Sequence, residues 1–410
     1  ILFDLDRFRV PTVPSLESPL HDKYENQKVR HYAGYVQDKL EFENFIINAG
    51  VRVEYFDPNG LTISDLLAPP VPGQTFDQRM ERLEEADPKT FVLPRVGVSF
   101  PITDTGILHF SYGHFAQMPP LRSMFLNPEY EFGAGETPIF GNADMRPERA
   151  VQYEIGLQQQ IGDQLAFDVT GFFKDIRDYL AVQNVQFSTV SGESNYRVFL
   201  NKDYANVRGV TFALTKRRPR NGLLSATIDY TFQNAEGNNS DAGAFFFNFL
   251  SGRENELELI PLDFDQRHII SSTVTLTRPS SWSVSFIGSF STGYPYTPNL
   301  IDQNLDQLPN NGRKPTQFDV DAHLSKQFNF DRFGVRLFAK VFNVFDRLNE
   351  RFVFDETGTA RYSLNERLNV HAPWTSQYGQ PGIHTLEEWD TRPTWYSRPR
   401  SVKIGATLSF

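Results

Sequence analysis

Five carboxylates gather in one short polar stretch of the sequence. They are Glu254, Glu256, Glu258, Asp263 and Asp265. Carboxylate oxygens are the ligands that Ca²⁺ prefers, so this spacing could hold a calcium ion in a loop. A solvated acidic loop is the alternative interpretation, because charged side chains at a protein surface need no metal. No other cofactor is evident.

Large aromatic side chains mark two further polar stretches. The candidates are Trp374, Tyr378, Trp389, Trp395 and Tyr396 near the carboxyl end, and Tyr130 at the end of an earlier loop. Aromatic rings offer flat apolar surfaces with a polar edge, so these six could stack on sugars or grip a peptide. They could equally pack the loops together or belong to an aromatic belt at a membrane interface.

Covalent catalysis is not indicated. The sequence contains no cysteine and no HExxH, Walker A or GxSxG pattern. Asp319, Asp321 and His323 alternate along the chain and would share one face of a strand, where they could ligate a metal. We favour a polar lining for these three and expect that the chain is not an enzyme.

The elements that must position these residues are β-strands. The last ten residues, Ser401–Phe410, place apolar side chains at every even position and small, polar or charged ones at every odd position. The pattern recurs in Arg30–Glu41, Asn44–Phe56, Phe91–Phe100, Gly106–Phe115, Val151–Ile161, Leu165–Lys174, Val207–Lys216, Leu223–Gln233, His268–Thr277, Ser281–Gly293, Gln317–Phe330 and Phe333–Phe345. Only Lys326 interrupts the apolar row of Gln317–Phe330, and a short helix is expected at Gln78–Ala86.

Strands with one oily face, joined alternately by short turns and long loops, are typical of an outer-membrane barrel. No run approaches the roughly 20 apolar residues of a membrane-spanning helix, and mean hydropathy is −0.42. We therefore predict an all-β, transmembrane, antiparallel β-barrel with about fourteen strands in this chain, short periplasmic turns and long extracellular loops. The net charge of −10 argues against nucleic acid as a partner, and we interpret the one basic cluster, Lys216-Arg217-Arg218 with Arg220, as a solvated turn.

Several motifs in order along the chain resemble the carboxyl-terminal barrel of TonB-dependent outer-membrane receptors. They are YAGYVQDKL at residue 32, PRVGVSF at 94, SYGHFAQMPP at 111, GNADMRPERAVQYEIG at 141, DVTGFFKDIRDYL at 168, VRGVTFAL at 207, LDFDQRHII at 262, GYPYTP at 293, FAKVFNVFD at 338 and the ending RPRSVKIGATLSF. Among these receptors the chain most resembles the Oar-like group, whose members carry a carboxypeptidase-regulatory-like amino-terminal domain.

The resemblance implies a barrel of about 22 strands around a globular plug, with an amino-terminal box that contacts TonB. Residues 1–410 hold about fourteen strands and neither plug nor box, so we expect them to be the carboxyl-terminal portion of such a barrel. A smaller, self-contained barrel is the alternative. An open sheet of fourteen strands would leave two unpaired edges in lipid, so further strands must complete it if the count is right.

The implied function is that of a TonB-dependent receptor in the outer membrane of a Gram-negative bacterium. Its extracellular loops would capture a large solute, which would be imported, or exported in the Oar-like case, by energised gated passage. A passive porin, or a structural barrel that serves as a docking platform in an envelope complex, is the alternative. Expected partners are outer-membrane lipid, TonB through the amino-terminal region, the barrel-assembly machinery, and a surface lipoprotein or other envelope subunit. Phe410 fits the terminal aromatic signal read by that machinery.

Overall fold

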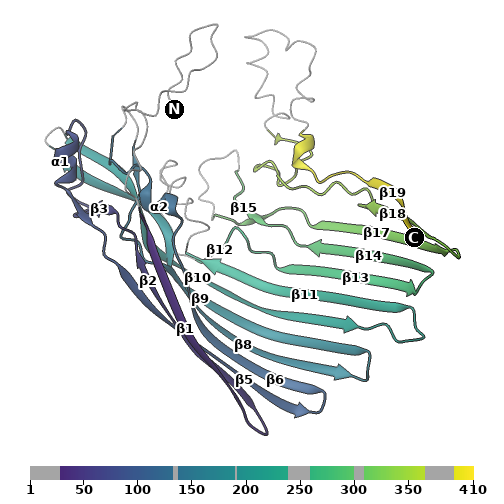
Figure 1. Ribbon diagram of the computed structural model, residues 1–410. Coiled ribbons are helices and arrows are strands. Elements are labelled where there is room, and N and C mark those ends of the chain that lie inside the picture. Colours follow the sequence, from purple (N-terminus) through teal and green to yellow (C-terminus); the bar gives the residue numbers. More distant parts are fainter. Residues whose placement is uncertain (1–27, 133–136, 190–191, 239–258, 300–308, 365–391) are drawn as a thin grey trace, which may run out of the picture.

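One large, curved antiparallel sheet dominates the protein (Figure 1). The structure is a computed structural model that describes residues 28–132, 137–189, 192–238, 259–299, 309–364 and 392–410. Within these residues the sheet follows chain order from β1 at one edge to β19 at the other. Its long strands are β1 (Arg30–Glu41), β2 (Ile46–Asp57), β5 (Lys89–Thr103), β6 (Gly106–Gln117), β8 (Glu148–Ile161), β9 (Leu165–Thr189), β10 (Gly192–Lys216), β11 (Leu224–Gly237), β13 (His268–Arg278), β14 (Trp282–Ser291), β17 (Gln317–Asn329), β18 (Gly334–Phe342) and β19 (Ser401–Ser409).

The remaining elements are short and lie among the long loops at one end of the sheet (Figure 1). Two of them extend the sheet itself, β7 (Ile139–Phe140) beside β10 and β12 (Ile260–Pro261) beside β11. Two separate pairs form from β3 (Leu61–Ile63) with β4 (Leu83–Glu85) and from β15 (Pro295–Tyr296) with β16 (Gly312–Arg313). The helical pieces are α1 (Phe76–Met80), α2 (Leu121–Phe125) and the 3₁₀ turn η1 (Pro393–Trp395). Among the described residues, no helix is long and apolar enough to cross a membrane.

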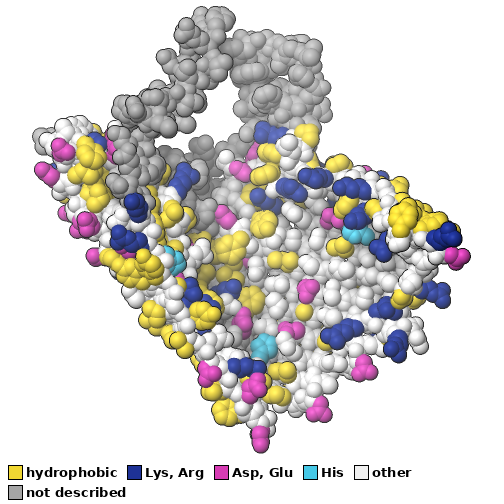
Figure 2. Space-filling view, viewed as in Figure 1, with side chains coloured by type: hydrophobic (Ala, Val, Ile, Leu, Met, Phe, Trp, Pro, Cys, Tyr) yellow, Lys and Arg dark blue, Asp and Glu magenta, His cyan; other side chains and the backbone are white. Residues whose placement is uncertain are grey.

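The pairing register gives the sheet two chemically different faces. Ser111 lies opposite Glu154 on the face that we call the polar face, and the adjacent Tyr112 lies opposite Tyr153 on the apolar face. Because successive side chains point to opposite sides of a strand, one register decides the environment of every residue in the sheet. Figure 2 looks onto the hollowed face of the sheet, where polar and charged side chains predominate over β8–β17.

The apolar face is uncovered. Val36 is 74% exposed, Ile155 51% and Ile404 82%, and each belongs to the apolar row of its strand. An apolar surface that continues across the whole sheet is unfavourable in water, whereas the hydrocarbon of a bilayer solvates it. The sheet is therefore built to stand in a membrane, with the core of an ordinary domain replaced by lipid on one side.

The expected helix is displaced and shorter than the sequence suggested. α1 begins after Thr75, whose hydroxyl accepts from the backbone N–H of Gln78 while the Gln78 side chain accepts from the Thr75 backbone N–H, a complete capping box. It ends at Met80, because Leu83–Glu85 pairs with Leu61–Ile63 as a strand. The prediction of a helix over Gln78–Ala86 was wrong beyond Met80.

Candidate functional site: the polar face and the loops above it

A charged cluster occupies the polar face where β1 and β2 approach the loops. The Glu54 carboxylate accepts from Arg52 Nε at 2.5 Å and lies 2.9 Å from His31 Nε2. The residue is only 7% exposed, so its charge is held between two basic groups away from bulk water. The Arg52–Glu54 ion pair is costly to break, because removal of one partner would leave the other as an uncompensated charge.

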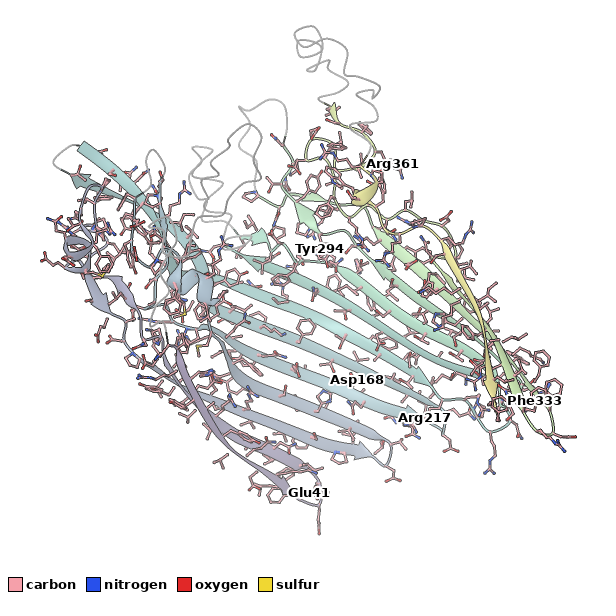
Figure 3. All side chains as sticks on the ribbon, turned by 45° about the horizontal axis from the view of Figure 1, so that its top comes forward. Glu41, Asp168, Arg217, Tyr294, Phe333 and Arg361 are labelled. Carbon is pink, nitrogen blue, oxygen red and sulfur yellow. The ribbon has the colours of Figure 1, made fainter. Side chains whose placement is uncertain are left out.

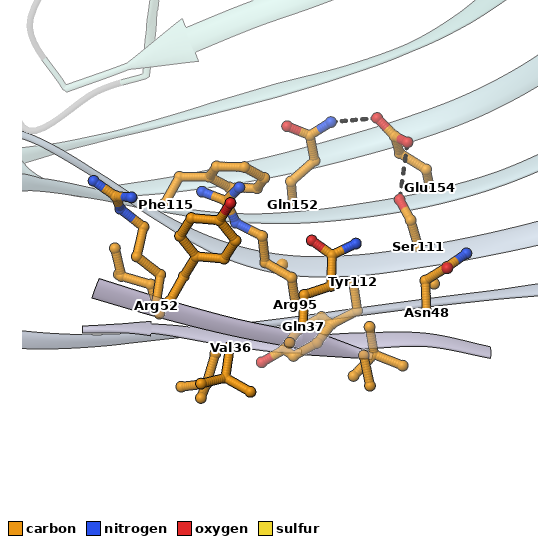
Figure 4. Close-up of a pocket in the computed structure, with 18 residues that line it drawn as sticks. Val36, Gln37, Asn48, Arg52, Arg95, Ser111, Tyr112, Phe115, Gln152 and Glu154 are labelled. Atoms are coloured by element: carbon orange, nitrogen blue, oxygen red, sulfur yellow. Dashed lines mark hydrogen bonds between the residues drawn. The ribbon is translucent and has the colours of Figure 1, made fainter. Parts of the chain in front are cut away.

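Polar groups from three further strands continue this surface (Figure 4). Arg95 of β5 places its guanidinium carbon 4.4 Å from the ring centroid of Phe115. Glu154 of β8 accepts from Ser111 Oγ at 2.9 Å and from the Gln152 amide. In Figure 4 these side chains extend from one side of the sheet, and Val36 extends from the other. The arrangement offers a solute both a cationic plane and hydrogen-bonding groups.

Hydroxyl groups replace charges farther along the polar face. Thr275 Oγ1 lies 2.8 Å from Ser285 Oγ, and Thr277 Oγ1 lies 3.0 Å from Ser283 Oγ, in cross-strand pairs between β13 and β14. These short, uncharged side chains keep the surface polar, as is typical of the interior face of an outer-membrane barrel.

Asp319, Asp321 and His323 share the polar face, as predicted, because they lie opposite Ser289, Ile287 and Ser285. Asp321 Oδ1 accepts from the Asn343 backbone N–H at 2.9 Å. No group of three metal-ligating side chains comes together anywhere in the described part of the chain. The three residues therefore lie in one row of the polar face, and their role as polar lining stays a prediction.

A long hairpin projects beyond the rest of the sheet. β9 and β10 each contain 25 residues and pair throughout, with register shifts around Asp203. At about 3.3 Å per residue each strand is about 80 Å long, whereas the apolar band of an outer-membrane barrel is about 25 Å tall. The parts from residue 176 to 189 and from residue 192 to 205, which we call the distal hairpin, therefore stand outside the membrane.

A compact apolar core joins the distal hairpin to two loops. Phe140 and Tyr196 are completely buried, with ring centroids 5.4 Å apart. The Tyr196 hydroxyl donates to the Leu66 carbonyl at 2.8 Å, which ties the hairpin to the loop after β2. We call the cluster the loop core, and its buried members are Ile63, Tyr130, Phe140, Val185, Phe187, Tyr196 and Val198. Burial raises the pKa of the Tyr130 and Tyr196 hydroxyls.

Tyr130 therefore has a different environment from the one expected for a ligand contact. Its side chain lies in the loop core at 3% exposure, and its hydroxyl donates to the Leu61 carbonyl at 2.8 Å. Both its ring and its polar group are already used within the protein. This placement fits the alternative interpretation, in which the aromatic residues pack the loops together.

Trp395 and Tyr396 lie in a second cluster of packed loop residues. Trp395 packs against Phe354, with centroids 4.7 Å apart, and Arg392 lies 4.7 Å from the Trp395 centroid. Tyr396 bridges to Glu350 through the backbone, and burial raises the pKa of its hydroxyl. The other three candidates, Trp374, Tyr378 and Trp389, lie outside the described residues.

Asp265 is a buried hub of the loops. It is fully buried, and its carboxylate accepts from the Ala235 N–H at 2.8 Å, from Arg267 Nε at 3.2 Å and from the Arg313 guanidinium. Asp263 accepts from the Asn310 amide at 2.6 Å. Two guanidinium groups thus take the place that a cation would need at Asp265, which argues against its role as a calcium ligand. Glu254, Glu256 and Glu258 lie outside the described residues.

The sequence profile of the TonB dependent receptor-like, beta-barrel family matches residues 3–344. The chain belongs to this family. The match confirms the prediction of an all-β, antiparallel sheet of the outer-membrane barrel type, and the family is one of outer-membrane β-barrels. The predicted number of strands and the closure of the barrel stay predictions. Three solved structures similar to this TonB-dependent receptor-like barrel are an import receptor and two transporters.

These three structures illustrate the similarity. The ferric-catecholate import receptor Fiu from Escherichia coli K12 shares 16% identity at a TM-score of 0.50, over 81% of this chain and 42% of its own. The FrpB iron transporter from Neisseria meningitidis gives 14% and 0.51, over 79% and 43%, and the ferric citrate transporter FecA gives 15% and 0.51, over 93% and 45%. The chain thus spans less than half the length of each. A comparison with curated proteins gave no match.

Some of the functional surface escaped the sequence analysis. The Glu54 cluster and the Arg95–Phe115 stack were not singled out, although the alternation already placed Arg52 and Glu54 on the polar side of their strand. A search for charged residues on that side of adjacent strands would have found them. The loop core offered no such signal, since Ile63 and Tyr196 are far apart in sequence.

Proposed function

We propose that this chain forms the carboxyl-terminal part of a TonB-dependent receptor that moves a large solute across the outer membrane. The observation that carries the proposal is the combination of a continuous polar face with a loop assembly already packed at one end of it. A solute captured at the loops would meet cationic, carboxylate and hydroxyl groups in turn along the wall.

The loops contribute preorganised surface. A loop core with fully buried rings loses little conformational freedom when a ligand binds, so more of the contact energy is retained as affinity. The named neighbours act on ferric catecholates, iron and ferric citrate, which makes iron chelates the first solutes to examine. Capture by the loops followed by gated passage is the mechanism that we infer, with TonB as the source of energy.

Two measurements on the full-length protein test the proposal. It should bind the purified periplasmic domain of TonB, and in planar lipid bilayers it should remain electrically closed without that domain. A stable open-pore conductance together with no TonB binding would overturn the proposal in favour of a passive porin.

A further inference from the structure

The charge of the short turns changes along the edge of the sheet that they form. The turns between β1 and β9 carry the carboxylates Glu43, Asp104 and Asp163, whereas the turns from β10 to β18 carry Arg217, Arg218, Arg220 and Arg332 with a single carboxylate, Asp331. In Figure 2 acidic side chains are more frequent along the lower edge under β1–β9 and basic ones along the edge under β11–β18, although an acidic side chain lies beside a basic one at the far right. Figure 3 marks the same edge with Glu41 at one end, Arg217 in the middle and Phe333 at the far end.

Two cations at this basic edge lie on the apolar face. Arg278 ends β13 opposite Trp282, and Trp282 lies opposite Lys326 of β17, so the three form one cross-strand row. The register puts this row on the side of Val284, Phe286 and Leu324, which is the side solvated by lipid. Lys326 is thus the one residue that interrupts the apolar row of its strand, and the structure shows that it does so beside another cation and an indole.

The cations of the row are unneutralised, in contrast to those at the loop end. There Arg79, Lys89, Arg149 and Arg361 each pair with a carboxylate. Within the described residues neither Arg278 nor Lys326 has an ion pair, and the nearest polar contact of Lys326 Nζ is Ser281 Oγ at 3.5 Å. Both side chains are exposed. Uncompensated charge on a lipid-facing surface is unfavourable, so an anion from the surroundings is the natural partner.

The position of the row identifies the anion. We propose that Arg278, Trp282 and Lys326, with Arg217 and Arg220 of the adjacent turn, bind the phosphate headgroup of an anionic glycerophospholipid on the short-turn side of the membrane. Adjacent strands are about 4.8 Å apart, so the two cations stand about 10 Å apart at their Cα atoms with the indole between them. Long basic side chains reach toward the headgroup level from such a site, and the indole occupies the same level. The turn lies next to the row, because Thr277 N–H donates to the Leu223 carbonyl at 2.9 Å.

Arg218 has a structural role in the basic turn and is not among the cations that we propose to bind lipid. Its guanidinium Nη1 donates to the carbonyl oxygens of Pro219, Arg220 and Gly222 at 3.3, 3.5 and 3.1 Å, so it holds the turn together. Arg217 and Arg220 are exposed and, among the described residues, form no ion pair. The basic cluster is therefore more than a solvated turn, since one member shapes it and two are left to face an anion.

Native mass spectrometry of the full-length protein tests the proposal, with phosphatidylethanolamine and phosphatidylglycerol offered in equal amounts. The wild-type protein should retain phosphatidylglycerol selectively. Removal of both charges, Arg278→Gln with Lys326→Gln, should weaken this retention by about 25-fold, at about fivefold per cation. Arg336→Gln is the matched control, because Arg336 lies at the same edge but on the polar face, opposite Gln327, and it should leave retention unchanged.

A second variant keeps the test valid if the double variant does not fold. Lys326→Leu completes the apolar row of β17, so it should fold at least as well as the wild type and still lose phosphatidylglycerol about fivefold. Inorganic phosphate at 10-fold excess over lipid should not displace the lipid. Equal retention of the two lipids by the wild type, full displacement by phosphate, or an equal loss in Arg336→Gln would overturn the proposal. The proposal would also be overturned if the wild-type protein bound an acidic protein and showed no preference between the two lipids.

Discussion

A lysine placed on the apolar face should destabilise the barrel, and one placed on the polar face of the same strand should not. Ile155 is the site of choice, because it lies near the middle of β8 (Glu148–Ile161), about 20 Å from either end of the strand, and is 51% exposed on the apolar face. Lysine at the bilayer midplane costs about 2–4 kcal/mol, falling to about 0–1 kcal/mol near the interface. Ile155→Lys should therefore lower the folding equilibrium constant roughly 30- to 700-fold.

Two control variants test whether the loss of stability comes from the face and the depth of the lysine or from any lysine in this strand. Gln158→Lys lies on the polar face of the same strand, within hydrogen-bond distance of Asp168, since the Gln158 amide is 2.7 Å from Asp168 Oδ2. It should change stability by less than about 0.5 kcal/mol, as expected of an exposed ion pair. Ile161→Lys, on the apolar face at the end of the strand, should cost no more than about 1 kcal/mol.

The assay is equilibrium unfolding of the full-length protein in phosphatidylcholine vesicles. Urea is the denaturant, and the folded fraction is measured from the shift of the folded band on unheated gels. The reasoning is refuted if Gln158→Lys destabilises as much as Ile155→Lys, or if the effect at Ile161 equals that at Ile155. Either result would mean that the two faces, or the depth along the strand, do not differ in the way that the register implies.

Four other predictions concern the loops and the chain end. Tyr196→Phe removes the donor to the Leu66 carbonyl and should cost about 1–3 kcal/mol in the loops alone, seen as faster proteolysis there with an unchanged barrel. Asp265→Asn leaves two arginines without their anion and should cost about 3–5 kcal/mol, while chelation of calcium leaves that region of the wild type unchanged in hydrogen exchange. Above pH 10 the free energy of unfolding of the loops should fall by about 1.4 kcal/mol per pH unit for each of the buried Tyr130 and Tyr196, because their pKa is raised in the folded state and only the unfolded state ionises. An unchanged near-UV circular dichroism above pH 10, or the same loss of signal in a variant with both tyrosines replaced by Phe, would contradict this. Phe410→Asp should lower outer-membrane insertion, and unchanged folding on unheated gels would count against the assembly role.

The strands could be predicted from the sequence because lipid and water impose a strict period of two. Arg30–Glu41 has the expected bounds, and Gln317–Asn329 differs from the expectation by one residue. The alternation also assigned faces correctly, since the register places Val402, Ile404 and Leu408 in one row of the closing strand. A row that must face hydrocarbon tolerates few exceptions, which is why Lys326 stood out.

The distal hairpin could not be predicted, because the constraint ends where the membrane ends. The strands were expected to stop at Lys174 and to begin again at Val207, but β9 runs on to Thr189 and β10 begins at Gly192. Asp178, at a positive φ of 58°, lies close to the register shifts, and this irregularity breaks the pattern of two. Beyond it Leu180, Ala181 and Val182 are buried in succession, which reads in sequence as a loop.

The loop contacts were equally inaccessible from sequence. Asp265 meets Arg313 across 48 residues, and Tyr196 meets Leu66 across 130. Nothing in local composition specifies such pairings, since they follow from how the sheet brings the loop ends together. Composition left open whether Asp265 is a calcium ligand or part of a solvated acidic loop, and it could not show that two guanidinium groups lie against its carboxylate.

Thiol accessibility along one strand tests the central claim, that the chain forms a membrane barrel wall with one face in lipid and one in water. Residues 1–410 contain no cysteine, so single cysteines can be placed at each position of Gln317–Asn329 in the full-length protein in the outer membrane, with any cysteine elsewhere in that protein replaced by serine. A membrane-impermeant thiol reagent should label the odd positions and spare the even ones from Phe318 to Leu324, with labelling again at the basic edge near Lys326. Uniform labelling, or labelling of the even positions in place of the odd ones, would contradict the account.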